Sequence, residues 1–236
     1  MKYSVLINAS NLHAGGGVQV AASFFCELLD LDLGDLDVVV WISSEVQDSL
    51  LKQGISLPDE LNSEVIDTHG LKGFFAPVNR RLNDFNLVFT IFGPNYLRPS
   101  NYINVVGFAQ LWVLDNSAYI TLPPISRIKS RLKFIIQKFL FKAADALVVE
   151  LEHARDGLYK DRIAKPGSVH VAYNCISSLY LKPETWQPLE ASINSSNFKV
   201  GFLSRDYAHK NTAILPDVKR VLAEKYGLNV DFFVTL

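Results

Sequence analysis

The sequence has little cysteine and no excess of charge of either sign. Its two cysteines, Cys26 and Cys175, show no zinc-ligand spacing, so we expect buried thiols rather than a disulfide framework or a metal site. With 23 basic and 24 acidic residues, the formal net charge is −1. This balance gives no general attraction to nucleic acid, so no nucleic-acid partner is expected.

The sequence also lacks long apolar runs. No stretch of about eighteen apolar residues occurs, so no membrane-spanning helix is predicted. The apolar start at residues 3–9 is too short for a secretory signal and is better interpreted as a first strand. We therefore expect a cytoplasmic protein.

Short apolar runs instead alternate with helical patterns along the chain. The runs lack a strict polar–apolar alternation, which is typical of strands buried on both faces of a sheet. Alternation of strands and helices favours a parallel sheet, so the sequence predicts an α/β, Rossmann-like fold. Strands are expected at residues 3–9, 36–43, 63–69, 87–94, 102–114, 145–150 and 168–174, and helices at 17–31, 45–54, 125–143 and 151–161.

The composition changes after Cys175. Residues 1–178 are predicted to form an N-terminal Rossmann-like domain, and residues 179–197, with prolines and serines but no clear period, an interdomain linker. Residues 198–236 are interpreted as a β-α-β unit, which cannot bury both faces of its sheet alone. We expect them to be the incomplete beginning of a second Rossmann-like domain.

Three glycines, Gly15, Gly16 and Gly17, lie between the first predicted strand and helix. Their amides can approach an anion closely, and the helix directs its free N–H groups to the same place. The turn is therefore either a diphosphate-binding loop or merely a flexible connection, with His13 as a candidate polar contact. It is not a P-loop, and Val20 stands where the dinucleotide fingerprint needs a third glycine.

A second candidate phosphate site follows the strand expected near residue 200. Arg205 and Lys210 lie five residues apart, just before a predicted helix. An arginine fork and a lysine ammonium at a helix N-terminus suit a diphosphate and can stabilise it as a leaving group. The alternative is a solvated basic loop.

The order of these motifs carries a family resemblance. The stretch Ala143 to Leu158 contains ADALVVE, the turn VAYNCI contains Asn174, and the loop VGFLSRDYAHKN ends at Asn211. Together with the glycine turn, this order resembles GT-B glycosyltransferases of the retaining family 4 type, which act in bacterial surface-polysaccharide synthesis. The resemblance covers essentially the whole chain.

The resemblance implies sugar transfer from a nucleotide-diphosphate donor to a hydroxyl acceptor, a glycan or a lipid-linked one, without a cofactor or a metal. It implies that the donor diphosphate is contacted by Gly15, Gly16, Gly17, Arg205 and Lys210. Relatives carry a histidine or an aspartate in the region that matches residues 107–116. Here Gln110 and Asp115 are the catalytic candidates.

The sequence also departs from that family. Its acidic E-x7-E donor motif would lie beyond residue 236, and Cys175 and Asn211 stand where relatives often have glycine. A second hypothesis is therefore a truncated or non-catalytic module that binds a nucleotide or a membrane and needs a partner chain. A third, a nicotinamide-dependent oxidoreductase, is disfavoured by Val20.

The predicted helix 125–143 is basic and amphipathic. It carries six basic residues and no acidic one, beside apolar residues at helical spacing. Such a face suits the anionic inner surface of a membrane. Because apolar stripes usually pack on their own sheet, we expect the stripe to be buried and only the basic face to contact lipid. The apolar residues are Ile128, Leu132, Ile135, Ile136, Phe139 and Leu140.

Overall fold

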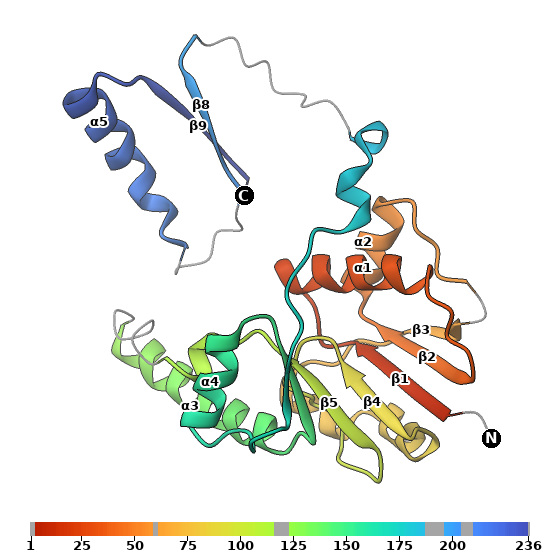
Figure 1. Ribbon diagram of the computed structural model, residues 1–236. Helices are drawn as coiled ribbons and strands as arrows, with labels where there is room; N and C mark the ends of the chain where they lie inside the picture. The colour runs from red at the N-terminus through yellow and green to blue at the C-terminus, as the bar shows by residue number, and fades with distance from the viewer. Residues whose placement is uncertain (1–2, 59–60, 116–122, 187–195, 204–209, 236) are drawn as a thin grey trace. The chain divides into compact units, whose positions relative to one another are not determined.

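The computed structural model describes residues 3–58, 61–115, 123–186, 196–203 and 210–235. The chain divides into two compact units, Met1–Glu184 and Thr185–Leu236. The boundary falls inside the segment that the sequence indicates as a linker. Figure 1 shows the elements of both units.

One parallel sheet organises the first unit. Within the described residues it has seven strands in the order β3-β2-β1-β4-β5-β6-β7. The α/β, Rossmann-like fold class predicted from the sequence is confirmed. The strands are β1 (Tyr3–Ala9), β2 (Leu36–Ile42), β3 (Ser63–Val65), β4 (Leu87–Thr90), β5 (Ile103–Phe108), β6 (Ala146–Val149) and β7 (Val169–Val171).

Helices α1 and α2 cover one face of the sheet (Figure 1). Side chains alternate along β1, so Ile7 packs toward α1 while Leu6 points to the opposite face, against Trp41 and Leu82. Short 3-10 segments cover that opposite face beside β1, and α3 and α4 cover it beside β5 and β6. These elements are α1 (Gly16–Leu28), α2 (Ser44–Lys52), η2 (Gly70–Phe75), η3 (Pro77–Asp84), η4 (Leu111–Val113), α3 (Pro124–Lys142) and α4 (Glu152–Lys160).

After β7 the chain returns to α1. There the carboxylate of Glu27 accepts a hydrogen bond from the backbone N–H of Ser178, 2.9 Å away. Residues beyond β7 form η6 (Ser178–Leu181) and η7 (Pro183–Thr185). The end of the first unit is thereby attached to its first helix.

The second unit contains a smaller parallel pairing. Strand β8 (Phe198–Phe202) pairs with β9 (Val230–Val234), and α5 (Leu215–Tyr226) connects them after the short η9 (Thr212–Ile214). Gly227, in the left-handed region at φ 65°, ends α5. This arrangement is the β-α-β unit that the sequence pattern indicates for residues 198–236.

Helix α3 differs from its expected packing. It buries Phe134, Gln137 and Phe141, whereas Ile128 and Phe139 of the predicted stripe are exposed. Ile136 and Leu140 are half-buried. The expectation that the stripe packs on the sheet was therefore wrong for four of its six residues, because a different face of α3 packs there. No helix in the described parts of the chain is long and apolar enough to cross a bilayer.

The cysteines also differ from expectation. Cys26 is half-buried in α1, and Cys175 is exposed. The prediction of two buried thiols was wrong because the chain around Cys175 has left the sheet and runs along its surface. Both thiols are free.

Candidate functional site

The candidate functional site of the first unit lies at the carboxyl end of β1. This strand lies between β2 and β4, so the connections that leave β1 and β4 diverge to opposite sides. In open parallel sheets ligands bind in the crevice at such a switch in strand order. Residues 10–15 and the segment that begins at Ile91 form the two sides of this edge.

The glycine turn lies at this switch. Gly15 is the N-cap of α1, with φ 66° and ψ −149°, a backbone conformation open essentially only to glycine. Gly16 is exposed, and a Cβ added to it would meet nothing within 4 Å. Among the described residues no side chain caps the start of α1, and its first turn has no acidic residue. The positive end of the helix is therefore accessible to an anion.

Buried hydroxyl and amide groups hold the end of β1 in place. The side-chain carbonyl of Asn8 accepts from the hydroxyl of Ser10 (2.7 Å), and its amide donates to the hydroxyl of Thr90 on β4 (3.2 Å). Ser10 also contacts the hydroxyl of Thr68, which follows β3 (2.9 Å). These four buried residues fix the turn that leads to the glycines.

Asn11 joins the two sides of this edge. Its side-chain amide donates to the backbone carbonyl of Phe92, 2.8 Å away. Its side-chain oxygen is buried and has no hydrogen-bond partner among the described residues. Leu12 and Phe92 also pack against Gly17: a Cβ added to this glycine would lie 3.3 Å from the Leu12 side chain and 3.8 Å from that of Phe92.

His13 is bound on both ring nitrogens. Its Nε2 lies 2.8 Å from the carbonyl oxygen of Thr68, and its Nδ1 lies 2.8 Å from Oε2 of Glu45. Both partner oxygens accept hydrogen bonds, so the contact favours a ring that donates from both nitrogens, which is the cation. Asp67 lies 3.7 Å from Nδ1, and the ring of His69 stacks on that of His13 at 4.1 Å.

The charges around His13 agree with this protonation. Burial is the largest single influence and opposes the charged ring, but the bonds to Thr68 and Glu45, with both carboxylates, raise the pKa of His13. The same bond from His13 lowers the pKa of Glu45. One imidazolium with the carboxylates of Glu45 and Asp67 leaves this side of the edge with a formal charge of −1.

The same three side chains are close enough to be considered as metal ligands. One ligand atom each of His13, Glu45 and Asp67 lies within 4.8 Å of the others. A metal would need an unprotonated ring nitrogen, and both nitrogens of His13 are engaged in hydrogen bonds. The arrangement fits an ion-paired structural contact better than a metal site.

The catalytic candidates lie at the same edge, beyond β4. Gln110 precedes η4 and Asp115 follows it, and both come after β5. Because β4 separates β1 from β5, the ends of β1 and β5 are roughly 10 Å apart. Asp115 is exposed, and its backbone N–H donates to Leu111. Gln110 is half-buried.

The two basic candidates lie in the second unit. Arg205 falls outside the described residues. Lys210 is exposed and precedes η9. Their predicted contact with a donor diphosphate stays a prediction.

The polar residues that organise this edge were not singled out from the sequence. Asn8, Ser10, Thr68 and Thr90 each stand at or just after the end of an apolar strand. Polar residues at the carboxyl ends of several parallel strands are a readable signal, because those ends meet at one edge. Their mutual hydrogen bonds, however, depend on the strand order.

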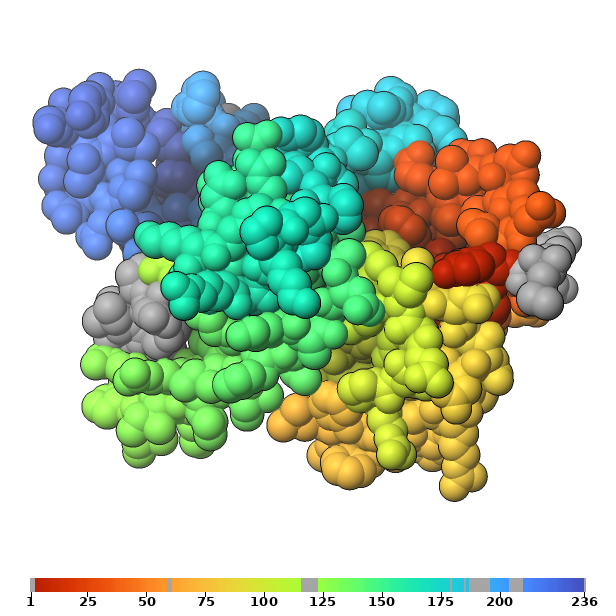
Figure 2. Space-filling view, turned by 60° about the horizontal axis from the view of Figure 1, so that its bottom comes forward, coloured from red at the N-terminus to blue at the C-terminus, as the bar shows by residue number. Residues whose placement is uncertain are grey.

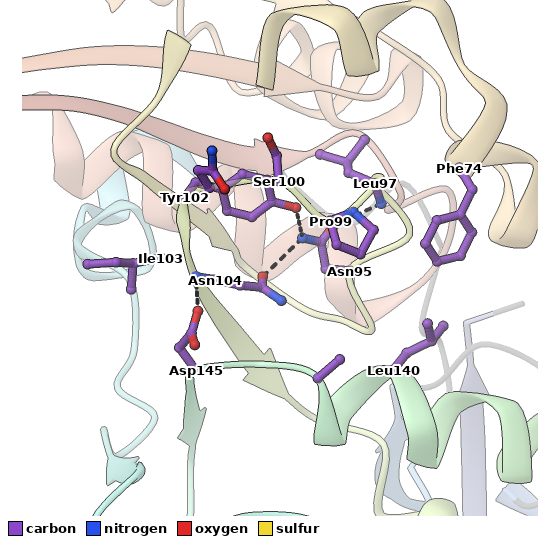
Figure 3. Close-up of a pocket in the computed structure, with 12 residues that line it drawn as sticks. Phe74, Asn95, Leu97, Pro99, Ser100, Tyr102, Ile103, Asn104, Leu140 and Asp145 are labelled. Carbon is purple, nitrogen blue, oxygen red and sulfur yellow. Dashed lines mark hydrogen bonds between the residues drawn. The ribbon is translucent and has the colours of Figure 1, made fainter. Parts of the chain in front are cut away.

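A cavity of about 660 Å³ lies at the opposite, amino-terminal edge of the sheet (Figure 3). In it the Asn95 amide donates to the hydroxyl of Tyr102 and to the side chain of Asn104, and Asp145 accepts from the backbone N–H of Asn104. Burial raises the pKa of Tyr102. These polar groups satisfy one another, so the cavity shows structural contacts rather than groups that await a ligand.

Comparison of the sequence with protein-family models and with curated proteins found no match.

Proposed function

We propose that the protein is a glycosyltransferase that moves a sugar from a nucleoside-diphosphate donor to a hydroxyl acceptor, in cell-surface polysaccharide or lipopolysaccharide synthesis. The observation that carries the proposal is the uncapped, glycine-rich start of α1 at the switch in strand order. The motif order that resembles retaining GT-B enzymes supplies the reaction class.

The glycine turn suits the leaving group of this reaction. When the sugar leaves, negative charge grows on the diphosphate, and fixed amide N–H groups and a helix dipole stabilise it without proton transfer. Gly16 offers an approach that no Cβ obstructs. The His13 side of the edge is negative overall, so the diphosphate is expected on the side of Gly16 and Phe92.

The acceptor is assigned to the loops after β4 and β5. Gln110 and Asp115 stand there as catalytic candidates, at the edge that also holds the glycine turn. A glycan or lipid-linked hydroxyl acceptor comes from the resemblance. Asp115 is exposed, as a residue that meets an incoming substrate must be.

Arg205 and Lys210 remain the proposed cationic contacts to the donor diphosphate. Two charge-assisted hydrogen bonds of about 1.5 kcal/mol each correspond to about a 100-fold change in affinity. We expect Arg205→Ala combined with Lys210→Ala to weaken binding of UDP, GDP or ADP by that factor in titration calorimetry of the whole chain.

The matched control for this experiment is Arg220→Ala combined with Lys225→Ala, which removes two exposed basic residues from α5. Equal affinity of the two double variants would refute the diphosphate assignment of Arg205 and Lys210. Nucleotide binding without sugar transfer to any acceptor would instead favour the non-catalytic module.

A further inference from the structure

Helix α3 presents an apolar stripe to solvent, made of four residues of the predicted stripe together with Ile125. The stripe residues have exposed fractions between 46% and 71%. They recur every three or four positions, so they form one continuous line on the helix surface. They are Ile125, Ile128, Leu132, Ile135 and Phe139.

The stripe points away from the domain that carries it. At 100° per residue the five stripe residues span about 80° of the helix circumference, and their centre lies about 165° from that of the buried residues Phe134, Gln137 and Phe141. Residues 124–133, all of them described, include no buried residue. Figure 2 shows α3, in green, on the surface of the unit.

Basic side chains flank the stripe on both sides. On the helical projection Arg127, Arg131 and Lys142 lie on one flank and Lys129 and Lys133 on the other. Lys138 lies on the first flank and pairs with Asp161 at 2.7 Å. The helix thus contains six of the chain's 23 basic residues and none of its 24 acidic ones, which leaves −7 on the remainder.

We infer that α3 is a membrane-docking helix, which inserts its apolar stripe between the headgroups of an anionic bilayer while its basic flanks contact the lipid phosphates. An exposed apolar line between two basic flanks is the pattern of helices that lie in the bilayer interface. A second copy of the chain fits less well, since apposed stripes would bring the basic flanks of two helices against each other.

This inference concerns a different surface from the proposed diphosphate site, so each can fail without the other. The test is flotation of the whole chain with vesicles of phosphatidylglycerol and phosphatidylcholine in equal parts, against vesicles of phosphatidylcholine alone. We expect binding to the anionic vesicles only, and its loss as salt concentration rises.

Two variants separate insertion from charge. Ile128→Ser combined with Leu132→Ser removes the centre of the stripe, and Lys129→Glu combined with Arg131→Glu reverses charge on both flanks; each is expected to lower partitioning by at least about tenfold. All four residues are exposed, so folding is retained. Leu51→Ser and Lys52→Glu, at exposed positions of α2, are the matched controls and should bind as the parent chain does.

Three results would overturn the inference. The stripe variant could bind anionic vesicles as well as the parent chain does. Binding could be indifferent to lipid charge. Or the parent chain could fail to bind vesicles while sedimenting as a dimer that the stripe variant abolishes, in which case a second copy covers the stripe.

Discussion

Helices α1 and α2 begin side by side at the same edge of the sheet, but their first turns differ. The start of α2 is closed by its own chain, because the hydroxyl of Ser43 accepts from the backbone N–H of Val46 and Glu45 stands in the first turn. The start of α1 has only Gly15 as its N-cap and no acidic side chain. Both helices direct the positive end of their dipole to this edge, but only the start of α1 is open to an anion.

The difference separates residues that stabilise this edge, around α2, from a helix start that is open to a ligand, at α1. Around α2, ion pairs and caps satisfy the polar groups, and His13 connects Glu45 to the residues after β3. Around α1, the buried hydrogen bonds of Asn8 and Ser10 support the turn from behind and leave the helix start open. A function of this edge is therefore sought at α1.

The largest expected effect is on the backbone of the glycine turn. Gly15→Val forces a β-branched residue into a conformation with φ 66° and ψ −149°, and we expect it to lower the free energy of unfolding by about 2–3 kcal/mol. Urea denaturation measures this. Gly16→Ala, beside it but in open space, should change stability by less than about 1 kcal/mol. Equal effects of the two would show that the turn is not held in this conformation.

Removal of the N-cap of α2 is expected to lower the free energy of unfolding somewhat less. Ser43→Ala removes the cap of Val46 and the hydrogen bond to the carbonyl of Leu12, and is expected to destabilise the protein by about 1–2 kcal/mol. Thermal unfolding of this variant and of Asp48→Ala, an exposed position further along α2, makes the comparison. A cap that contributes nothing would leave the two variants indistinguishable.

The smallest effect is the pH dependence of the His13 contact. The pKa of His13 is raised above 6.5, so its contribution to stability is complete below pH 6.5 and is lost as pH rises through the folded value. The pKa of Glu45 is lowered below 4.5, so its contribution is complete above pH 4.5 and is lost as pH falls through the folded value. Between pH 4.5 and pH 6.5 the contributions of His13 and Glu45 to stability are therefore both complete.

Since Glu45 and Asp67 are well exposed, the contact is expected to contribute about 1 kcal/mol or less. The measurement is the difference in unfolding free energy between the parent chain and His13→Gln from pH 4.5 upward through the folded pKa of His13, over which the difference is expected to shrink. A difference that grew with rising pH would contradict the cationic ring.

The fold was largely readable from the sequence, and the site only in part. Apolar runs such as residues 36–42 mark buried strands wherever they pack, so the α/β class followed from local pattern. The network of Asn8, Thr68 and Thr90 could not be predicted, because it joins three strands whose order is a tertiary property. The exposure of Ile128 was missed because periodicity shows that a stripe exists but not which face of the helix packs on the sheet.

The open start of α1 is tested most directly by Gly16→Asp. The added carboxylate meets no neighbouring atom and lies at the positive end of the helix, so stability should stay unchanged or rise by about 0.3–1 kcal/mol. The same carboxylate would occupy the proposed anion site and repel the diphosphate. We predict that calorimetry with UDP, GDP and ADP finds binding to the parent chain and to Gly16→Ala, and at least about tenfold weaker binding to Gly16→Asp. Equal affinity of Gly16→Asp and Gly16→Ala for the nucleotide would contradict diphosphate binding at this helix.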